Sequence, residues 1–137
     1  MNFAAPAMLL TAAATLLAVL VTLGTAILVA RTRRRVGIQP PVMTGSPDLE
    51  CALRVQGNTI EQIVMFLPAL WLATIYFQGW APGIIGFAWS LGRIAFAIGY
   101  KPANPGRRGP GFGIGIFSTL ALVALAAFGI FNAWSLA

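Results

Sequence analysis

The residues best suited to chemistry in this sequence are polar side chains set among long apolar stretches. Arg54, Asn58 and Glu61 follow one another at i, i+4 and i+7, which places them on one face of a helix. Arg93 lies seven residues before Tyr100, again on one helical face and about 10 Å from it along the axis. Arginine binds carboxylates through its bidentate fork, and a glutamate can hold an amine. The pattern therefore suits a small molecule that carries carboxylates and a free amine, bound in an anion-binding cavity.

The same residues also admit a purely structural interpretation. Ionisable side chains inside a membrane are costly, so they are expected to face a bundle interior or a wet cavity and to be paired. Glu61 would then pair with Arg54 or Arg93 and hold the helices together. Gln56 points away from the face of Arg54, toward a neighbouring chain. Spacing alone leaves both interpretations open.

The chain that positions these residues has the composition of a membrane protein. Of its 137 residues 58% are hydrophobic and 9% are charged, whereas a soluble domain carries roughly 25% charged residues. The stretches 1–30, 62–92 and 109–137 hold no charged side chain. Because a helix needs about 20 apolar residues to cross a bilayer, we expect an all-α membrane protein with one four-helix domain. The spans are expected at about 3–30, 50–77, 84–100 and 110–134.

The connections between these spans indicate how the chain crosses the membrane. Ser46 and Pro47 are typical of a helix start, residues 79–83 form a predicted turn, and Pro110 can open the last helix. Both connections that contain Lys or Arg, 31–54 and 101–108, follow odd-numbered helices and so share a side. The positive-inside rule places them in the cytoplasm and both termini on the opposite side.

Composition also excludes several classes of function. The net charge of +6 does not indicate a nucleic-acid partner, because no soluble domain remains to carry the basic groups. There is no histidine and there are only three acidic residues, so a metal centre or a Ser-His-Asp triad is not expected. Cys51 is the single cysteine, so no internal disulfide can form.

One stretch of the chain resembles a known family. Arg54-Val-Gln56-Gly-Asn58-Thr-Ile-Glu61, followed by Phe66-Leu67-Pro68-Ala69-Leu70-Trp71, is similar to the MAPEG superfamily of membrane-associated proteins in eicosanoid and glutathione metabolism. The similarity is strongest to the branch of leukotriene C4 synthase and microsomal glutathione transferases. It extends to Arg33-Arg34, Pro40-Pro41, Gly45, Arg93, Gly99-Tyr100 and Arg107, and so covers nearly the whole chain.

This resemblance implies a homotrimer that binds glutathione between adjacent subunits, near the cytoplasmic face. Carried over residue by residue, it implies that the tripeptide is contacted by Arg33, Arg54, Gln56, Asn58, Glu61, Arg93 and Tyr100. Arg107 would lie beside the glutathione sulfur, and Arg34 near the electrophile or leaving group. A nearby guanidinium favours the thiolate of a thiol whose pKa is otherwise about 8.5. The implied activity is conjugation of glutathione to lipophilic electrophiles that arrive from the membrane, with peroxidase activity toward lipid hydroperoxides as an additional option.

Two departures from the family pattern keep other functions open. Gln62 and Phe96 stand where the leukotriene synthase pattern has tyrosines, so two phenol hydroxyls are lost. A non-catalytic member that binds lipid, or acts as a scaffold, is one alternative. A small proton-coupled exporter with Glu61 as proton carrier is another, although it would not need the flanking polar residues or a deep Arg93.

Overall fold

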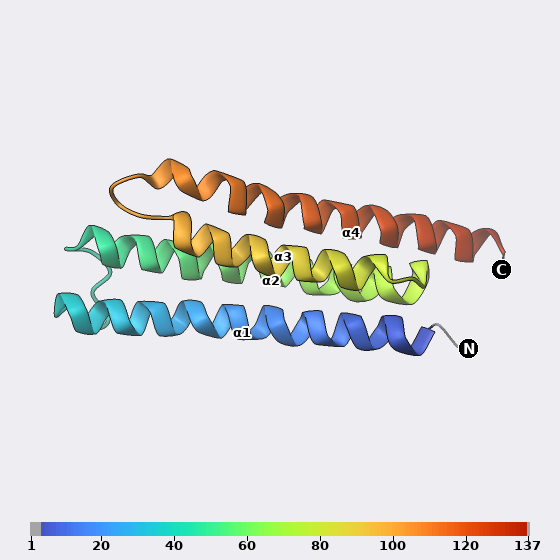
Figure 1. Cartoon of the computed structure of the whole chain (residues 1–137), viewed down its shortest axis with the longest axis horizontal. Coiled ribbons are helices and arrows are strands. Elements are labelled where there is room, and N and C mark those ends of the chain that lie inside the picture. Colours follow the sequence, from blue (N-terminus) through green and yellow to red (C-terminus); the bar gives the residue numbers. More distant parts are fainter. Residues whose placement is uncertain (1–3, 137) are drawn as a thin grey trace.

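The computed structural model describes residues 4–136 and consists of long helices that run side by side (Figure 1). The four α-helices are α1 (Ala4–Val36), α2 (Pro47–Phe77), α3 (Ala81–Gly99) and α4 (Gly109–Ser135), and a short 3-10 helix, η1 (Pro105–Arg108), precedes α4. All four α-helices are long and apolar enough to cross a membrane. The predicted four-helix membrane bundle is therefore confirmed for this part of the chain, and only residue 3 of the predicted spans lies outside it.

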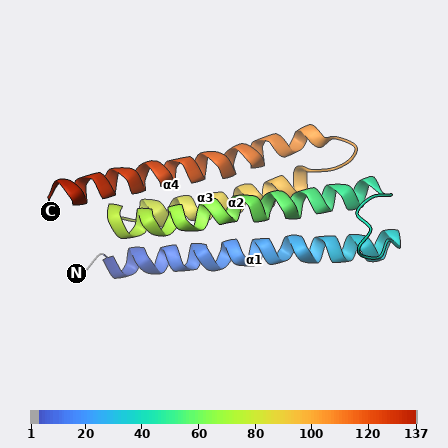
Figure 2. The same ribbon diagram turned by 180° about the vertical axis from the view of Figure 1, so that it is seen from behind.

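The helices pack in a ring in the order α1, α2, α4, α3, with a smaller diagonal contact between α2 and α3. Figure 2 shows the same arrangement from behind, with α2 in front of α3. This order gives the bundle separate α2–α4 and α1–α3 sides. Each side carries its own cavity, and the two cavities have different linings.

The first helix is longer than the predicted span. The sequence suggested an end near residue 30, before the arginine cluster, but α1 continues to Val36. Arginine is a good helix former, and cations are favourable in the last turn of a helix, so the charge ends the apolar stretch without ending the helix. Gly37 ends α1 instead, because its φ of +72° is the left-handed conformation of a helix cap. Its N–H donates to the Arg33 carbonyl oxygen at 2.9 Å.

Two other boundaries also differ from the prediction. α3 begins at Ala81 rather than Ile84, with Pro82 inside its first turn, where a missing N–H has no cost. The predicted polar loop at 101–109 contains η1 immediately before α4. A 3-10 helix has about 3 residues per turn, so Arg107 and Arg108 leave η1 in directions about 120° apart.

Small residues allow the helices to approach closely. The main core cluster includes Ala18, Ala69, Ala73 and Ala126, packed around Phe66 and Trp89, whose rings stack with centroids 4.1 Å apart. Small side chains at helix contacts are typical of membrane bundles, where packing replaces the hydrophobic effect as the driving force. Gly111 of α4 lies directly against the α3 backbone, and Gly129 of α4 lies directly against the end of α2.

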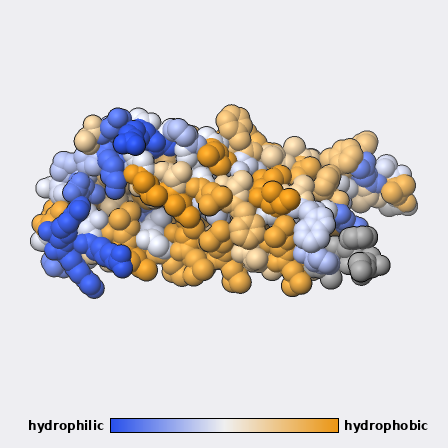
Figure 3. Space-filling view, viewed as in Figure 1, coloured by the Kyte–Doolittle hydropathy of each residue, from blue (hydrophilic) through white to orange (hydrophobic). Residues whose placement is uncertain are grey.

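Charge gathers at one end of the bundle. The α1–α2 and α3–α4 connections both lie at that end (Figure 1), and the space-filling view shows hydrophilic residues there, at the left, beside a largely hydrophobic body (Figure 3). The prediction that the two basic connections share a side is therefore confirmed. The assignment of this end to the cytoplasm stays a prediction.

The contact at Gly111 gives a test of this packing. A Cβ at Gly111 would collide with the Phe96 backbone nitrogen and lie 2.7 Å from the Gly92 carbonyl oxygen. Gly111→Ala should therefore destabilise the bundle by about 2 kcal/mol, because the helix backbones must separate. The measurement is thermal unfolding of the detergent-purified protein.

Gly113→Ala is the matched control, because a Cβ at Gly113 meets only the edge of the Phe117 ring, at 4.0 Å. It should leave the melting temperature unchanged or slightly raised, since alanine favours helix more than glycine does. Equal melting temperatures for the two variants would contradict the close α3–α4 contact.

Candidate functional site

A groove of about 860 Å³ opens at the basic end of the bundle, between α2, the end of α3 and the start of α4. Arg54, Asn58 and Glu61 line it from α2, and Tyr100 lines it from the end of α3. The three α2 residues face the groove together because their spacing keeps them on one side of the helix. The structure thus brings four of the sequence-predicted site residues into one cavity.

Arg93 lies beneath this groove and is completely buried, with a relative exposure of 0%. Its Nη2 donates hydrogen bonds to Asn58 Oδ1 and to Thr59 Oγ1, both at 3.0 Å. Its guanidinium carbon lies 4.2 Å from the centre of the Phe96 ring. The expectation that Arg93 faces the bundle interior is therefore confirmed, and its partners are neutral oxygens on α2.

The ion pairs expected from a purely structural interpretation are not formed. Within residues 4–136 the one ion pair joins Arg35 and Asp48 at 2.7 Å, and Glu61 is paired with neither Arg54 nor Arg93. Glu61 Oε2 lies 3.5 Å from Asn58 Nδ2, at the limit of a hydrogen bond. Arg93 holds the Asn58 carbonyl oxygen, so the amide nitrogen of Asn58 is turned toward Glu61. The carboxylate of Glu61 is exposed and open to a ligand in the groove.

The two departures from the family pattern both lie next to Arg93. Phe96 lines the groove, while Gln62 is 97% buried and lies against Gly115 of α4. Both amide atoms of Gln62, and Nε and Nη1 of Arg93, have no protein partner within the described residues. A cluster of buried polar atoms without protein partners therefore lies between α2, α3 and α4.

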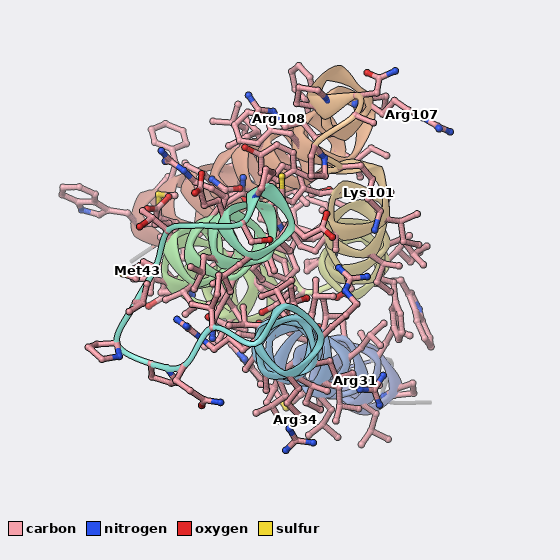
Figure 4. The ribbon with its side chains drawn as sticks, turned by 90° about the vertical axis from the view of Figure 1, so that its left-hand side faces the viewer. Arg31, Arg34, Met43, Lys101, Arg107 and Arg108 are labelled. Atoms are coloured by element: carbon pink, nitrogen blue, oxygen red, sulfur yellow. The ribbon has the colours of Figure 1, made fainter. Side chains whose placement is uncertain are left out.

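The end of α3 and η1 bring a further cation to the groove. Arg108 lines it, with its guanidinium carbon 4.6 Å from the centre of the Tyr100 ring. Arg107 does not line this groove, and Figure 4 shows its side chain projecting away from the bundle. In a single chain Arg107 therefore does not reach the groove, and the place beside the glutathione sulfur that the resemblance implies for it stays a prediction. The tight turn of η1 explains the difference between Arg107 and Arg108, because adjacent arginines there cannot both face the same cavity.

Three more of the predicted site residues lie outside the groove in a single chain. Arg33 donates to the carbonyl oxygen of Val42 at 2.6 Å and so fixes the loop that forms one rim. Arg34 is exposed at the end of α1 (Figure 4), and Gln56 is half-buried on another face of α2. None of the three lines the groove.

Sequence reasoning missed two charged residues of the groove, Glu50 and Arg108. Glu50 had a usable signal, because it precedes Arg54 by four residues and so extends the same helical face. Arg108 had no such signal, since the 3-10 turn that aims it is not visible in hydropathy. The groove thus presents two carboxylates and two guanidinium groups around an amide and a phenol. This combination suits a ligand that carries both negatively and positively charged groups. No cluster of metal-ligating side chains occurs among the described residues.

Comparisons with known proteins place this arrangement in a family. The model of the MAPEG family matches residues 11–128. An uncharacterized protein of Synechocystis is 43% identical over 122 residues, which are 89% of this chain and 85% of that protein. Leukotriene C4 synthase of Bos taurus is 35% identical over 88% of this chain and 80% of its own length. Microsomal glutathione S-transferase 2 of Homo sapiens is 32% identical over 80% of this chain and 74% of its own length. The match spans all four helices and the residues that form the groove, and the chain accordingly belongs to the MAPEG family.

Proposed function

We propose that this protein is a membrane-embedded glutathione-dependent transferase that joins the glutathione sulfur to lipophilic electrophiles. The observation that carries the proposal is the groove at the basic end, where Arg54, Asn58, Glu61 and Tyr100 converge in an otherwise apolar bundle. Relatives named as a leukotriene C4 synthase and a microsomal glutathione S-transferase support the same class of activity. Conjugation of electrophiles points to detoxification as the broad role.

The chemistry of the groove matches the chemistry of glutathione. The tripeptide carries two carboxylates, one ammonium group and one thiol. Arg54 and Arg108 are suited to its carboxylates, because a guanidinium binds a carboxylate through two parallel hydrogen bonds. Glu61 is suited to the ammonium group, and Asn58 and Tyr100 supply neutral hydrogen-bonding groups. Arg93 acts from below, by holding the Asn58 amide in one orientation.

The reaction needs the sulfur as a thiolate. The thiol proton passes to water, and a guanidinium beside the sulfur stabilises the remaining negative charge. The thiolate then attacks an electrophilic carbon, so that an S–C bond forms while the bond to the leaving group or to an epoxide oxygen breaks. An epoxide oxygen then takes a proton from water, whereas a halide leaves as the anion. With a lipid hydroperoxide as the electrophile, the thiolate attacks the peroxide oxygen and the O–O bond breaks to release the alcohol, and a second glutathione then displaces hydroxide from the oxidised sulfur to give glutathione disulfide and water.

The family pattern assigns the sulfur contact to Arg107 and a role near the electrophile to Arg34. In a single chain neither of these side chains lines the groove, and nor do Arg33 and Gln56. We propose a homotrimer in which an adjacent subunit supplies such residues and completes the site between subunits. Arg108 is the alternative sulfur partner, because it already faces the groove.

We place the site at the cytoplasmic face, where the positive-inside rule puts the basic connections, and both termini on the opposite side. Cellular glutathione would then reach the groove from the cytoplasm while the electrophile arrives from the lipid.

The second candidate is a non-catalytic lipid-binding member of the family. The observation in its favour is the pair Gln62 and Phe96, which bring no hydroxyl group to the neighbourhood of Arg93. It predicts saturable binding of lipophilic ligands and no conjugation of an aryl halide with any common thiol.

The proposed mechanism is tested by the ultraviolet absorbance of the thiolate. Adding glutathione to the detergent-purified protein should produce a thiolate signal, and Arg107→Ala should remove it because the sulfur loses its cation. Arg108→Ala is measured beside it. If the thiolate signal is lost only in Arg108→Ala, Arg108 is the residue that stabilises the sulfur. If the signal is unchanged in both variants, neither arginine activates the thiolate.

Binding of the ammonium group is tested separately at Glu61. Glu61→Gln should weaken glutathione binding by about tenfold or more, because a hydrogen bond between charged groups contributes roughly 1.5–3 kcal/mol. Isothermal titration with glutathione gives the affinity.

Asp48→Asn is the control for Glu61→Gln. It also removes one negative charge from α2, but Asp48 pairs with Arg35 outside the groove. Its glutathione affinity should stay within about twofold of the unsubstituted protein. Equal glutathione affinities for Glu61→Gln and Asp48→Asn would show that Glu61 does not bind the ammonium group.

A further inference from the structure

A separate basic cleft lies at the same end of the bundle, between the end of α1, the start of α2 and the end of α3. It encloses about 200 Å³ and is lined by Arg31, Arg35, Lys101 and Asp48, among others. Asp48 is paired with Arg35, whereas Arg31 and Lys101 have no carboxylate within ion-pair distance in the described part of the chain. Three cations against one carboxylate leave two positive charges in excess. Figure 4 shows Arg31 and Lys101 at the ends of the neighbouring helices α1 and α3.

An apolar groove continues from this cleft toward the middle of the bundle. It encloses about 340 Å³ between α1 and α3 and is lined mainly by aliphatic residues, including Leu20, Val21, Ile94 and Ile98. Thr25 and the buried Arg93 are its polar members. Leu28 and Ala97 line both cavities, so the groove begins where the cleft ends. From Leu20 to Leu28 it follows α1 for about 12 Å, at 1.5 Å per residue. The space-filling view shows this face, with its polar end and its apolar body (Figure 3).

We propose that this face binds one anionic phospholipid, with the phosphate in the basic cleft and an acyl chain in the apolar groove. The cleft lies at the end of the membrane spans, which is the level of the lipid headgroups. Arginine binds phosphate through its planar fork, and basic side chains near a membrane surface attract anionic lipids. A choline headgroup would bring its own cation to a cleft that already has positive charge in excess, so a headgroup with net negative charge is favoured.

Glutathione does not suit this pair of cavities. Its groups are polar throughout, whereas the α1–α3 groove below the cleft is mainly aliphatic, and Arg93 in its wall already donates to Asn58 and Thr59. The candidate glutathione groove lies on the α2–α4 side and shares only Tyr100 with the basic cleft. The lipid site is therefore additional to the proposed transferase site and does not depend on it.

The experiment is native mass spectrometry of the full chain in detergent with added phosphatidylglycerol, phosphatidylcholine or inorganic phosphate. Phosphatidylglycerol should bind several-fold more tightly than phosphatidylcholine. Arg31→Gln with Lys101→Gln should weaken phosphatidylglycerol binding by about 25-fold, since each basic side chain near the headgroup contributes a factor of about five. The matched control is Arg34→Gln with Arg108→Gln, which removes two charges from the same end but none from the cleft. The control should change lipid binding less than twofold.

The acyl groove is tested with Gly24→Leu. Gly24 lines the groove, and a Cβ there meets no atom within 4 Å, so a leucine fills the space without disturbing the helices. Binding of phosphatidylglycerol should fall at least fivefold while the melting temperature is maintained.

Three outcomes would overturn the proposal: equal binding of the two lipids, equal losses in the two charge variants, or inorganic phosphate binding as tightly as the lipid. A change in oligomer mass without a change in lipid binding would instead identify this face as a subunit contact.

Discussion

The buried guanidinium of Arg93 is the constraint on which the rest of the site depends. A charged group inside a membrane bundle must find polar partners, because lipid offers none. Arg93 finds them on α2, in Asn58 and Thr59, and so fixes α3 against α2 at one register. The same contact turns the Asn58 amide toward Glu61. The orientation of groups in the groove thus follows from how one cation is satisfied beneath it.

Close backbone packing makes this arrangement possible. Gly111 and Gly115 let α4 approach α2 and α3, with Gly115 lying against Gln62 and the Arg93 side chain. A larger residue at Gly115 would meet Gln62 Oε1 at 2.7 Å and displace the Gln62 side chain. Apolar packing and buried polar groups therefore share the same α2–α4 contact, and neither can change without the other.

Much of the fold follows from local sequence features, whereas part of the site does not. Hydropathy and helical spacing predicted four spans, the shared face of Arg54, Asn58 and Glu61, and a buried Arg93, because each depends only on nearby residues. The end of α1 was predicted too early, since an arginine cluster ends an apolar stretch but not a helix. The directions of Arg107 and Arg108 depend on a 3-10 turn, and the inward position of Gln62 depends on the approach of α4. The first is a local turn that hydropathy does not reveal, and the second is a tertiary contact that spacing does not encode.

Tyr100 lines two cavities, the basic cleft between α1, α2 and α3 and the polar groove beside α2 and α4. A ligand that moved this ring toward one cavity would change the space in the other. Ligands in the two cavities would therefore be thermodynamically linked through the phenol, and each would alter the affinity of the other by the same factor. The composition of the surrounding membrane would then act as an effector of whatever binds in the groove.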